Sequence, residues 1–282
     1  MVAQSGQRSS LAVSAAFAVP AIPAFVGRAT RAADADLFGD TVRGPSPRTG
    51  DGEASHWWLP GPARLCLVTG SVAIEVRKRR FASLPRIALL GPTDRAHRIV
   101  ATRGSVVSVA MTPLGWSRLS RRAASEYRNV VVPVEDVLLP RAVAALADRV
   151  DSAREDEPIC RDSLHALLTP LTVAHRDEAL VVALAAMVRE HASVQVRDLH
   201  DRLGISEARL RSLALRHFGT PAKILLRRAR FLHSLAKVDF RAGHNSYANI
   251  DPTYHDVPHF LRDAHFFLGT TPRRFRLLSS QH

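Results

Sequence analysis

The chain has 282 residues, of which 46% are apolar, so it can form two ordinary domains and is not an intrinsically disordered polypeptide. Lysine and arginine total 39, mostly arginine, against 26 aspartates and glutamates, which leaves a formal charge of +13. This excess predicts a polyanionic partner, either nucleic acid or an acidic membrane surface. No run of about 18 uncharged apolar residues occurs, so no transmembrane helix is predicted.

The segment 1–56 is predicted to be a flexible lead. Leu11–Val26 is apolar and rich in alanine, which weakly resembles an export signal, but Pro20 and Pro23 interrupt it. Residues 27–56 are rich in Gly, Pro, Ser, Asp and Arg, a composition typical of loops and linkers. We therefore favour a disordered lead or a first strand over an exported precursor.

Short apolar runs separated by turn residues follow over 57–140, and this pattern is typical of strands. Gly70 and Gly104 are among the residues that separate the runs, and we interpret them as turns. The predicted strands are Leu65–Val68, Val72–Val76, Ile87–Leu90, Arg98–Ala101 and Val106–Met111. This half is predicted to be a small antiparallel β-rich domain that senses a ligand or mediates self-association.

Beyond Pro140, Ala, Leu and Val recur at helical spacing and no β-type alternation returns. We interpret 141–175 as a helical linker and 176–282 as an all-α domain. The predicted fold class is therefore α+β, with the β-rich domain first.

The all-α part contains an internal repeat of about 50 residues. Each copy has a helix-capping residue, apolar residues four and eight positions after it, and a glycine thirteen positions after it. The matching pairs are Ser206 with Asp256, Leu210 with Phe260, Ala214 with Ala264 and Gly219 with Gly269. Thr-Pro follows each glycine, at Thr220-Pro221 and Thr271-Pro272, and predicts a helix that threonine caps.

Val196, Leu199 and Leu203 share one helical face ahead of a tight turn at Gly204-Ile205. Helix, short glycine turn and helix is the geometry that places a second helix in the major groove of DNA. A single helix is predicted between the two copies, over Ala222–Ala236. It carries a basic face that we expect to contact phosphates, formed by Lys223, Arg227, Arg228 and Arg230.

The strings RDLHDRLGISEARL, HFGTPAKILLRRARFLHSLAK and YHDVPHFLRDAHFFLGTTPRRFR resemble the C-terminal domain of AraC/XylS transcription regulators. More weakly, LLGPTDRAHRIVAT and VVVPVEDVLLPRAVAALADRV are similar to the N-terminal part of one AraC-like branch. The resemblance implies a seven-helix, homeodomain-like DNA-binding domain behind a regulatory domain. Its two helix-turn-helix units would be joined by a linker helix.

The resemblance also implies which residues contact bases. These positions fall on Ala208, Arg211 and Ser212 of the first helix and on Pro258, His259 and Arg262 of the second. The two arginines are expected to engage guanine, whereas His259 has an equally weighted interpretation as a residue of the capping turn. The full predicted DNA-binding set is Ala208, Arg209, Arg211, Ser212, Arg216, Arg228, Pro258, His259 and Arg262.

The sequence departs from the family pattern in three places. The loop at Gly219-Thr220-Pro221 is one residue short. Ser212 stands where the family usually has arginine. The segment Tyr247–Tyr254 is short, contains Pro252, and has Thr253 where glycine is expected. Because proline breaks an interior helical turn, we expect the second unit to be distorted or to bind DNA weakly.

No catalytic constellation, metal site or cofactor motif is predicted. His255, His259 and His265 do not share one helical face, because the helix cap falls at Asp256. Cys66 and Cys160 are too few for a disulfide framework or a zinc site, which fits a reducing cytoplasm.

We therefore expect a cytoplasmic, non-enzymatic transcription factor that binds double-stranded promoter DNA. RNA polymerase, a small-molecule effector and a second copy of the chain are further expected partners; a membrane is not. One alternative is a degenerate homologue that acts through protein contacts without specific DNA binding. A second alternative, an enzyme built on the β domain, would require clustered His and Glu on strands, where only Glu75 and His97 occur.

Overall fold

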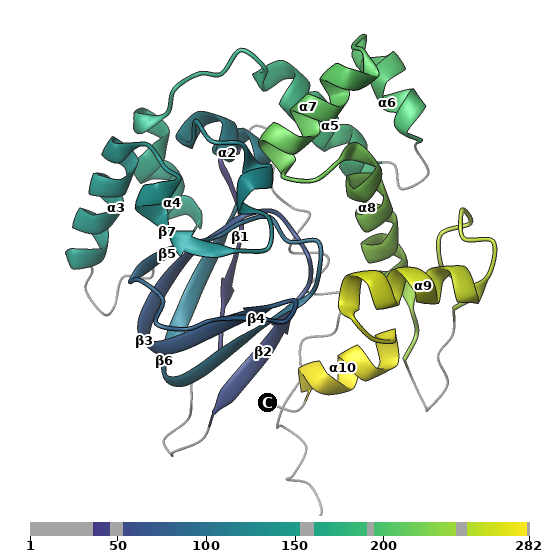
Figure 1. Cartoon of the computed structure of the whole chain (residues 1–282), viewed down its shortest axis with the longest axis horizontal. Coiled ribbons are helices and arrows are strands. Elements are labelled where there is room, and N and C mark those ends of the chain that lie inside the picture. The colour runs from purple at the N-terminus through teal and green to yellow at the C-terminus, as the bar shows by residue number, and fades with distance from the viewer. Residues whose placement is uncertain (1–35, 46–52, 153–160, 191–194, 241–246, 281–282) are drawn as a thin grey trace, which may run out of the picture.

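The computed structural model describes residues 36–45, 53–152, 161–190, 195–240 and 247–280. The apolar segment Leu11–Val26 and Cys160 lie outside these ranges. An antiparallel sheet occupies the N-terminal half and helices follow it, so the predicted α+β class is confirmed (Figure 1). Within the described residues, no helix has the length and apolar character needed to cross a membrane.

Seven strands form one sheet in the order β1-β6-β3-β5-β7, with β2 on β6 and β4 on β3. Their bounds are β1 Phe38–Arg43, β2 Ala54–Trp58, β3 Arg64–Val76, β4 Arg79–Phe81, β5 Ile87–Leu90, β6 His97–Met111 and β7 Val131–Pro133. The predicted lead at 1–56 is thus corrected, because β1 and the start of β2 lie inside it and pair with β6. Polar residues in both strands gave this stretch the composition of a linker.

The two central strands are longer than predicted. β3 joins two predicted runs and β6 joins two others, because Gly70 and Gly104 are paired residues inside the strands and not turns. Gly70 has a φ of 66°, and a Cβ on it would lie 1.9 Å from the Arg103 carbonyl oxygen. These glycines therefore permit close approach of two long strands where each would otherwise be interrupted.

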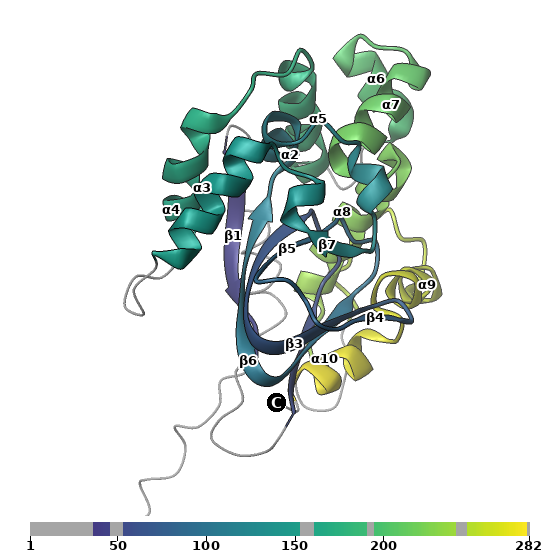
Figure 2. The same cartoon turned by 60° about the vertical axis from the view of Figure 1, so that its left-hand side comes forward.

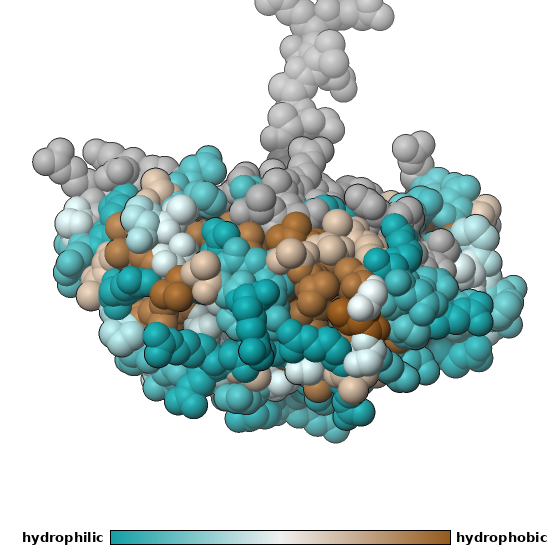
Figure 3. All heavy atoms as spheres, turned by 90° about the horizontal axis from the view of Figure 1, so that it is seen from above, coloured by the Kyte–Doolittle hydropathy of each residue, from teal (hydrophilic) through white to brown (hydrophobic). Residues whose placement is uncertain are grey.

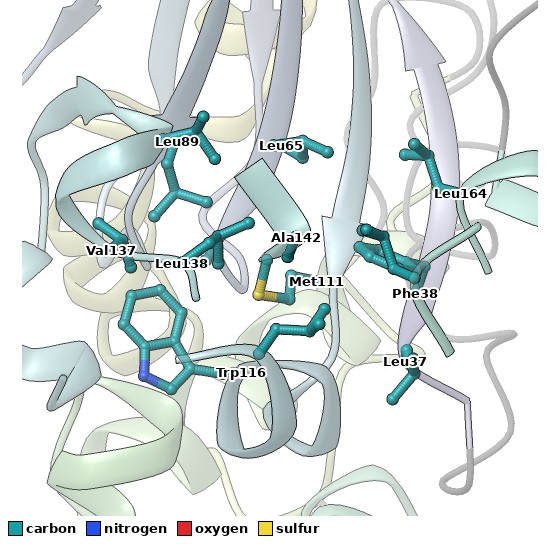
Figure 4. Packing of buried hydrophobic residues seen from close by; sticks show 14 of the residues in the cluster. Leu37, Phe38, Leu65, Leu89, Met111, Trp116, Val137, Leu138, Ala142 and Leu164 are labelled. Atoms are coloured by element: carbon teal, nitrogen blue, oxygen red, sulfur yellow. The ribbon is translucent and has the colours of Figure 1, made fainter. Parts of the chain in front are cut away.

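The main core of the β domain includes helices that the sequence assigned to a linker. The α-helices of the N-terminal half are α2 Pro113–Leu119, α3 Pro140–Asp151 and α4 Arg161–Leu168, and the last two lie in the predicted linker. Ala142 and Leu164 are fully buried with Phe38, Leu65 and Trp116 in a single cluster (Figure 4). The described parts of this segment, 141–152 and 161–175, consequently belong to the N-terminal domain, since their apolar side chains complete that core.

The C-terminal helices are α5 Glu178–Glu190, α6 Val196–Leu203, α7 Glu207–Phe218, α8 Ala222–Lys237, α9 Val257–Leu268 and α10 Pro272–Ser280. They enclose two separate cores. One lies among α5, α6, α7 and the start of α8, and the other lies among the end of α8, α9 and α10. α8 spans both cores, as the linker helix of the predicted repeat should.

The two halves of the chain contact each other at several places. α7 packs on the 3-10 helix Ala124–Tyr127 and on α2. α9 and α10 lie on the side of the sheet away from α3 and α4 (Figure 2). There the rings of Trp57 and Phe275 meet edge to face at 6.0 Å, and the Ala96 amide donates to the Phe267 carbonyl at 2.7 Å.

Candidate nucleic-acid interface

α6 and α7 form a helix-turn-helix unit whose caps match the predicted ones. α6 ends at Gly204 in the left-handed conformation, with a φ of 63°. The Ser206 hydroxyl then accepts a hydrogen bond from the Arg209 amide and starts α7, which ends at Gly219 with a φ of 75°. Short turns with left-handed glycine fix the angle between two helices without strain.

α7 buries one stripe and exposes the opposite one. Its buried residues are Leu210, Leu213, Ala214, His217 and Phe218. Ala208, Arg211, Ser212 and Arg216 are all exposed, so four predicted base- or phosphate-contacting positions lie on one accessible surface. Figure 3 shows the side of the molecule where α5, α6 and α7 lie: hydrophilic residues cover much of it and surround separate hydrophobic patches.

Arg209 does not belong to this accessible surface. Its side chain is about one-third exposed and forms an ion pair with Asp177, which is buried just ahead of α5. Arg216 is exposed, and its guanidinium lies 3.4 Å from the Arg121 carbonyl oxygen. Arg209 therefore fixes α7 to the domain core, whereas Arg211 is the arginine of α7 for which the structure shows no such anchor.

α9 repeats the pattern of α7 fifty positions later. The Asp256 carboxylate accepts a hydrogen bond from the His259 amide at 2.6 Å, and Gly269 ends the helix with a φ of 77°. The buried residues are Phe260, Asp263, Ala264, Phe267 and Leu268, each fifty positions after its counterpart in α7. The two helices therefore have the same buried register.

The segment before α9 differs from its counterpart. Residues 247–254 form turns in place of the helix that α6 provides in the first unit, as Pro252 predicts. The Asp251 carboxylate accepts hydrogen bonds from the Thr253 amide at 2.9 Å and hydroxyl at 2.5 Å. The Ser234 hydroxyl accepts one from the Asp251 amide at 2.9 Å, which ties this turn to α8.

A buried carboxylate compensates for the missing helix. Asp263 of α9 accepts hydrogen bonds from the Tyr254 hydroxyl at 2.7 Å and from Arg227 Nε of α8 at 2.7 Å. Burial raises the pKa of the Tyr254 phenol, and the negative charge of Asp263 raises it further. Asp263 thus links α8, α9 and the turn segment at a single point.

Two of the predicted positions on α9 are accessible and one is partly enclosed. Pro258 and Arg262 are exposed. The ring of His259 is half-buried, edge to face with Tyr254 at 5.0 Å and stacked on His255 at 6.0 Å. His259 therefore takes part in the capping turn, which is one of the two interpretations that the sequence left open.

α8 differs from its prediction at both Thr220 and Arg228. Pro221 occupies the N-cap position, and the Thr220 hydroxyl is buried and makes no hydrogen bond within the described residues. The expected capping does occur in the second copy, where the Arg274 amide lies 3.4 Å from the Thr271 hydroxyl. Arg228, predicted to contact phosphates, instead donates to the carbonyls of Gly61 and Thr93 in the β domain, at 3.3 and 3.0 Å.

Arg228 lines a cavity between the two halves of the chain that sequence analysis did not anticipate. The cavity has a volume of about 210 Å³ and is largely apolar. Its walls include Pro60, Leu114, Val181, Ala185, Leu225 and Leu232. Burial lowers the pKa of the Arg228 guanidinium to about 10, against the opposing effect of the Asp94 charge. The sequence did not predict this cavity because its walls come from separate segments spread between positions 39 and 232.

The fold and this surface together define a two-domain protein, with a β-rich N-terminal domain followed by helices that contain a capped helix-turn-helix unit. Over most of its length the chain is similar to solved structures of ToxT from Vibrio cholerae. One covers 88% of this chain and 100% of its own at 10% identity and a TM-score of 0.45. Two others have bound ligands, one an unsaturated fatty acid and one a naphthalenyl butenoic acid, at 10% identity and TM-scores of 0.44 and 0.45. No family model matches the chain, and no curated protein does.

Proposed function

We propose that this protein is a cytoplasmic, sequence-specific DNA-binding transcription regulator of the AraC/XylS type. The observation that carries the proposal is α7: a helix capped at both ends, buried on one side, and accessible at the positions where a recognition helix contacts bases. The surrounding charge supports it, because residues 180–282 contain 16 lysines and arginines against 8 aspartates and glutamates. Promoter DNA is the partner that such a helix fits.

In this proposal α7 supplies most of the specificity. Arg211 is exposed near the middle of the helix, and a guanidinium there can donate two hydrogen bonds to the O6 and N7 atoms of guanine. Ala208 and Ser212 lie on the same accessible stripe and allow the helix to approach the base edges closely. α9 contributes Arg262 and Pro258 from a unit in which residues 247–254 form turns in place of a helix, so its contribution to specificity is smaller.

Binding-site selection from genomic DNA with the purified full chain, followed by footprinting, tests the proposal. We expect a fragment preferred over bulk competitor DNA, protected over at least one major-groove segment, with affinity that falls steeply as salt rises. If no fragment is preferred at either low or moderate salt, the degenerate homologue that acts through protein contacts becomes the better explanation.

Arg211→Ala should reduce discrimination between a selected site and random duplex by about tenfold to a hundredfold, because a bidentate arginine–guanine contact contributes about 1–3 kcal/mol. Competition gel shifts on both duplexes measure the ratio. Arg43→Ala removes an exposed arginine of the β domain and serves as the matched control, for which we expect an unchanged ratio. Equal losses on specific and random duplex for Arg211→Ala would show that it contacts only phosphates.

The cavity beside Arg228 supports effector binding as part of the same proposal. Arg228 has no ion pair among the described residues, and only its Nη1 donates hydrogen bonds there, which leaves Nε and Nη2 for a ligand. A half-buried guanidinium on an apolar cavity fits an amphipathic carboxylic acid, whose charge pairs with the arginine while its hydrocarbon part fills the cavity. Because both halves of the chain form the walls, such a ligand would stabilise one arrangement of the two domains.

A medium-chain acid should bind better than the alcohol of the same length. We expect octanoate to raise the melting temperature of the full chain at concentrations about tenfold to a hundredfold lower than octanol requires, since a charge-assisted hydrogen bond contributes about 1.5–3 kcal/mol. Arg228→Met keeps the apolar stem and removes the charge, so it should abolish the preference for the acid. An undiminished preference in that variant would exclude Arg228 as the carboxylate partner.

A further inference from the structure

Three potential metal ligands meet beneath α7, outside the surface assigned to DNA. His217 belongs to the buried stripe of α7, and His175 and Asp177 lie in the segment just ahead of α5. Nε2 of His217 lies 3.7 Å from Asp177 Oδ2, and Nδ1 of His175 lies 3.9 Å from the same oxygen. One ligand atom from each of the three residues can be chosen so that all lie within 4.8 Å of one another.

His217 is the unusual member of this cluster. Its side chain is 1% exposed, and neither ring nitrogen has a hydrogen-bond partner within the described residues. A buried imidazole without a partner is costly, so native proteins usually satisfy such a group with a hydrogen bond, a water or a metal ion. Burial and the neighbouring His175 together lower the pKa of this ring to about 4, against the opposing charge of Asp177.

The carboxylate is already oriented for a ligand. Arg209 forms an ion pair with Oδ1 of Asp177, which leaves Oδ2 directed at the two histidines. A ligating carboxylate is commonly held by such an outer partner, which fixes its orientation. The Arg209–Asp177 pair therefore has a second consequence besides anchoring α7: it orients the carboxylate toward His217.

We propose that His175, Asp177 and His217 bind a divalent transition metal ion, with Zn²⁺ as the best match. Two imidazoles and one carboxylate are a common zinc ligand set, and water completes the tetrahedron. With metal–ligand distances of about 2.0–2.1 Å, neighbouring ligand atoms lie about 3.4 Å apart, so the two distances to Asp177 Oδ2 contract by about 0.3–0.5 Å. The distance between the two histidine nitrogens, which is at most 4.8 Å, contracts by up to about 1.4 Å, so the His175 ring moves toward His217 when the ion binds. His175 Nδ1, which accepts a hydrogen bond from the Asp177 amide at 3.2 Å, exchanges that bond for the metal.

The composition of the site selects against Mg²⁺ and Ca²⁺. Those ions require six or more oxygen ligands, whereas this cluster offers a single carboxylate with one oxygen already bound to Arg209. Imidazole favours Zn²⁺, Ni²⁺ and Cu²⁺. The ion would join α7 to the segment that begins α5, and so would fix the recognition helix from its buried side.

The test uses the full chain freed of metal with a chelator, then titrated with Zn²⁺ in a calorimeter and with Co²⁺ in a spectrophotometer. We expect one high-affinity Zn²⁺ per chain, the intense visible bands of four-coordinate Co²⁺, and a higher melting temperature with Zn²⁺. His175→Ala alters a partly exposed ligand and should lose all three signals while it retains the circular dichroism of the native fold. His217→Ala should behave in the same way if it folds.

His255→Ala is the matched control, because His255 and His259 form the other close histidine pair, on the surface at α9. The proposal predicts wild-type Zn²⁺ binding in this variant. It is overturned if His255→Ala loses the ion, if His175→Ala keeps it, or if wild-type protein gives only six-coordinate Co²⁺ bands. These measurements contain no DNA, so their outcome is independent of whether the chain regulates transcription.

Discussion

Asp263→Ala should lower the free energy of unfolding by about 3–5 kcal/mol, the cost of removing one partner from a buried ion pair. The Asp263 carboxylate is 4% exposed and has two partners, Arg227 and the Tyr254 hydroxyl. Without it, the phenol loses its acceptor in a buried environment and the guanidinium loses its counter-ion. Because these contacts replace the helix that the second unit lacks, we also expect α9 and the turn segment to exchange amide hydrogens faster.

Urea denaturation of the full chain, with hydrogen exchange followed by mass spectrometry, measures both effects. Asp256→Ala is the matched control, since it removes an exposed aspartate on the same helix that serves only as its cap, and should cost about 1 kcal/mol. A loss of equal size in the two variants would mean that Asp263 acts as an ordinary polar residue and does not hold the unit together.

The features of this fold that the sequence predicts are those with local causes. The caps at Ser206 and Asp256, the terminal glycines and the buried stripes follow from side-chain chemistry within a few residues, and all were placed correctly. The internal repeat reinforced each of them, because two copies with the same spacing are unlikely to arise by chance. Pro252 likewise predicted a distorted second unit, and residues 247–254 form turns ahead of α9.

The polar residues inside the two stripes were not predictable in the same way. Position for position, His217 corresponds to Phe267 and Asp263 corresponds to Leu213, so each helix buries one polar residue where its copy has an apolar one. Each depends on groups from another segment: His217 on the region before α5, and Asp263 on α8 and the turn at Tyr254. Helical periodicity assigns a residue to a face but contains no information about such distant partners.

The same limitation explains why the sequence could not distinguish the accessible arginines from those that are anchored to other segments. Composition and spacing predict that Arg209, Arg211 and Arg228 all contact DNA, because all three are cations on predicted helices. The structure distinguishes them by their partners. Arg209 forms an ion pair with Asp177, and Arg228 donates hydrogen bonds to two backbone carbonyls of the β domain. Contacts with distant segments of the chain thus decide which arginines of a basic sequence are accessible to a polyanion.

His97→Phe should make the stability of the chain much less sensitive to acid. His97 of β6 is 1% exposed, and its ring packs edge to face on Trp58 at 5.6 Å. Burial lowers the pKa of this imidazole from 6.5 to about 3, and the positive charge of Arg64 acts in the same direction. Between these two values the unfolded chain binds a proton at His97 and the folded chain does not.

The sign of the effect follows from proton linkage, because stability rises with pH wherever the unfolded state binds more protons. The contribution of His97 is therefore fully present above about pH 6.5 and is lost progressively as the pH falls toward about 3, by up to about 4 kcal/mol. Phenylalanine keeps the aromatic contact with Trp58 and cannot titrate.

Free energies of unfolding for wild type and His97→Phe, each measured at about pH 7 and about pH 4, test this argument. We expect the variant to retain or exceed wild-type stability at the higher pH and to lose less than wild type at the lower one. His233→Ala removes an exposed histidine of α8 and should leave the wild-type difference unchanged. Parallel pH profiles for wild type and His97→Phe would show that water reaches this ring in the folded chain and that its burial does not control the acid response.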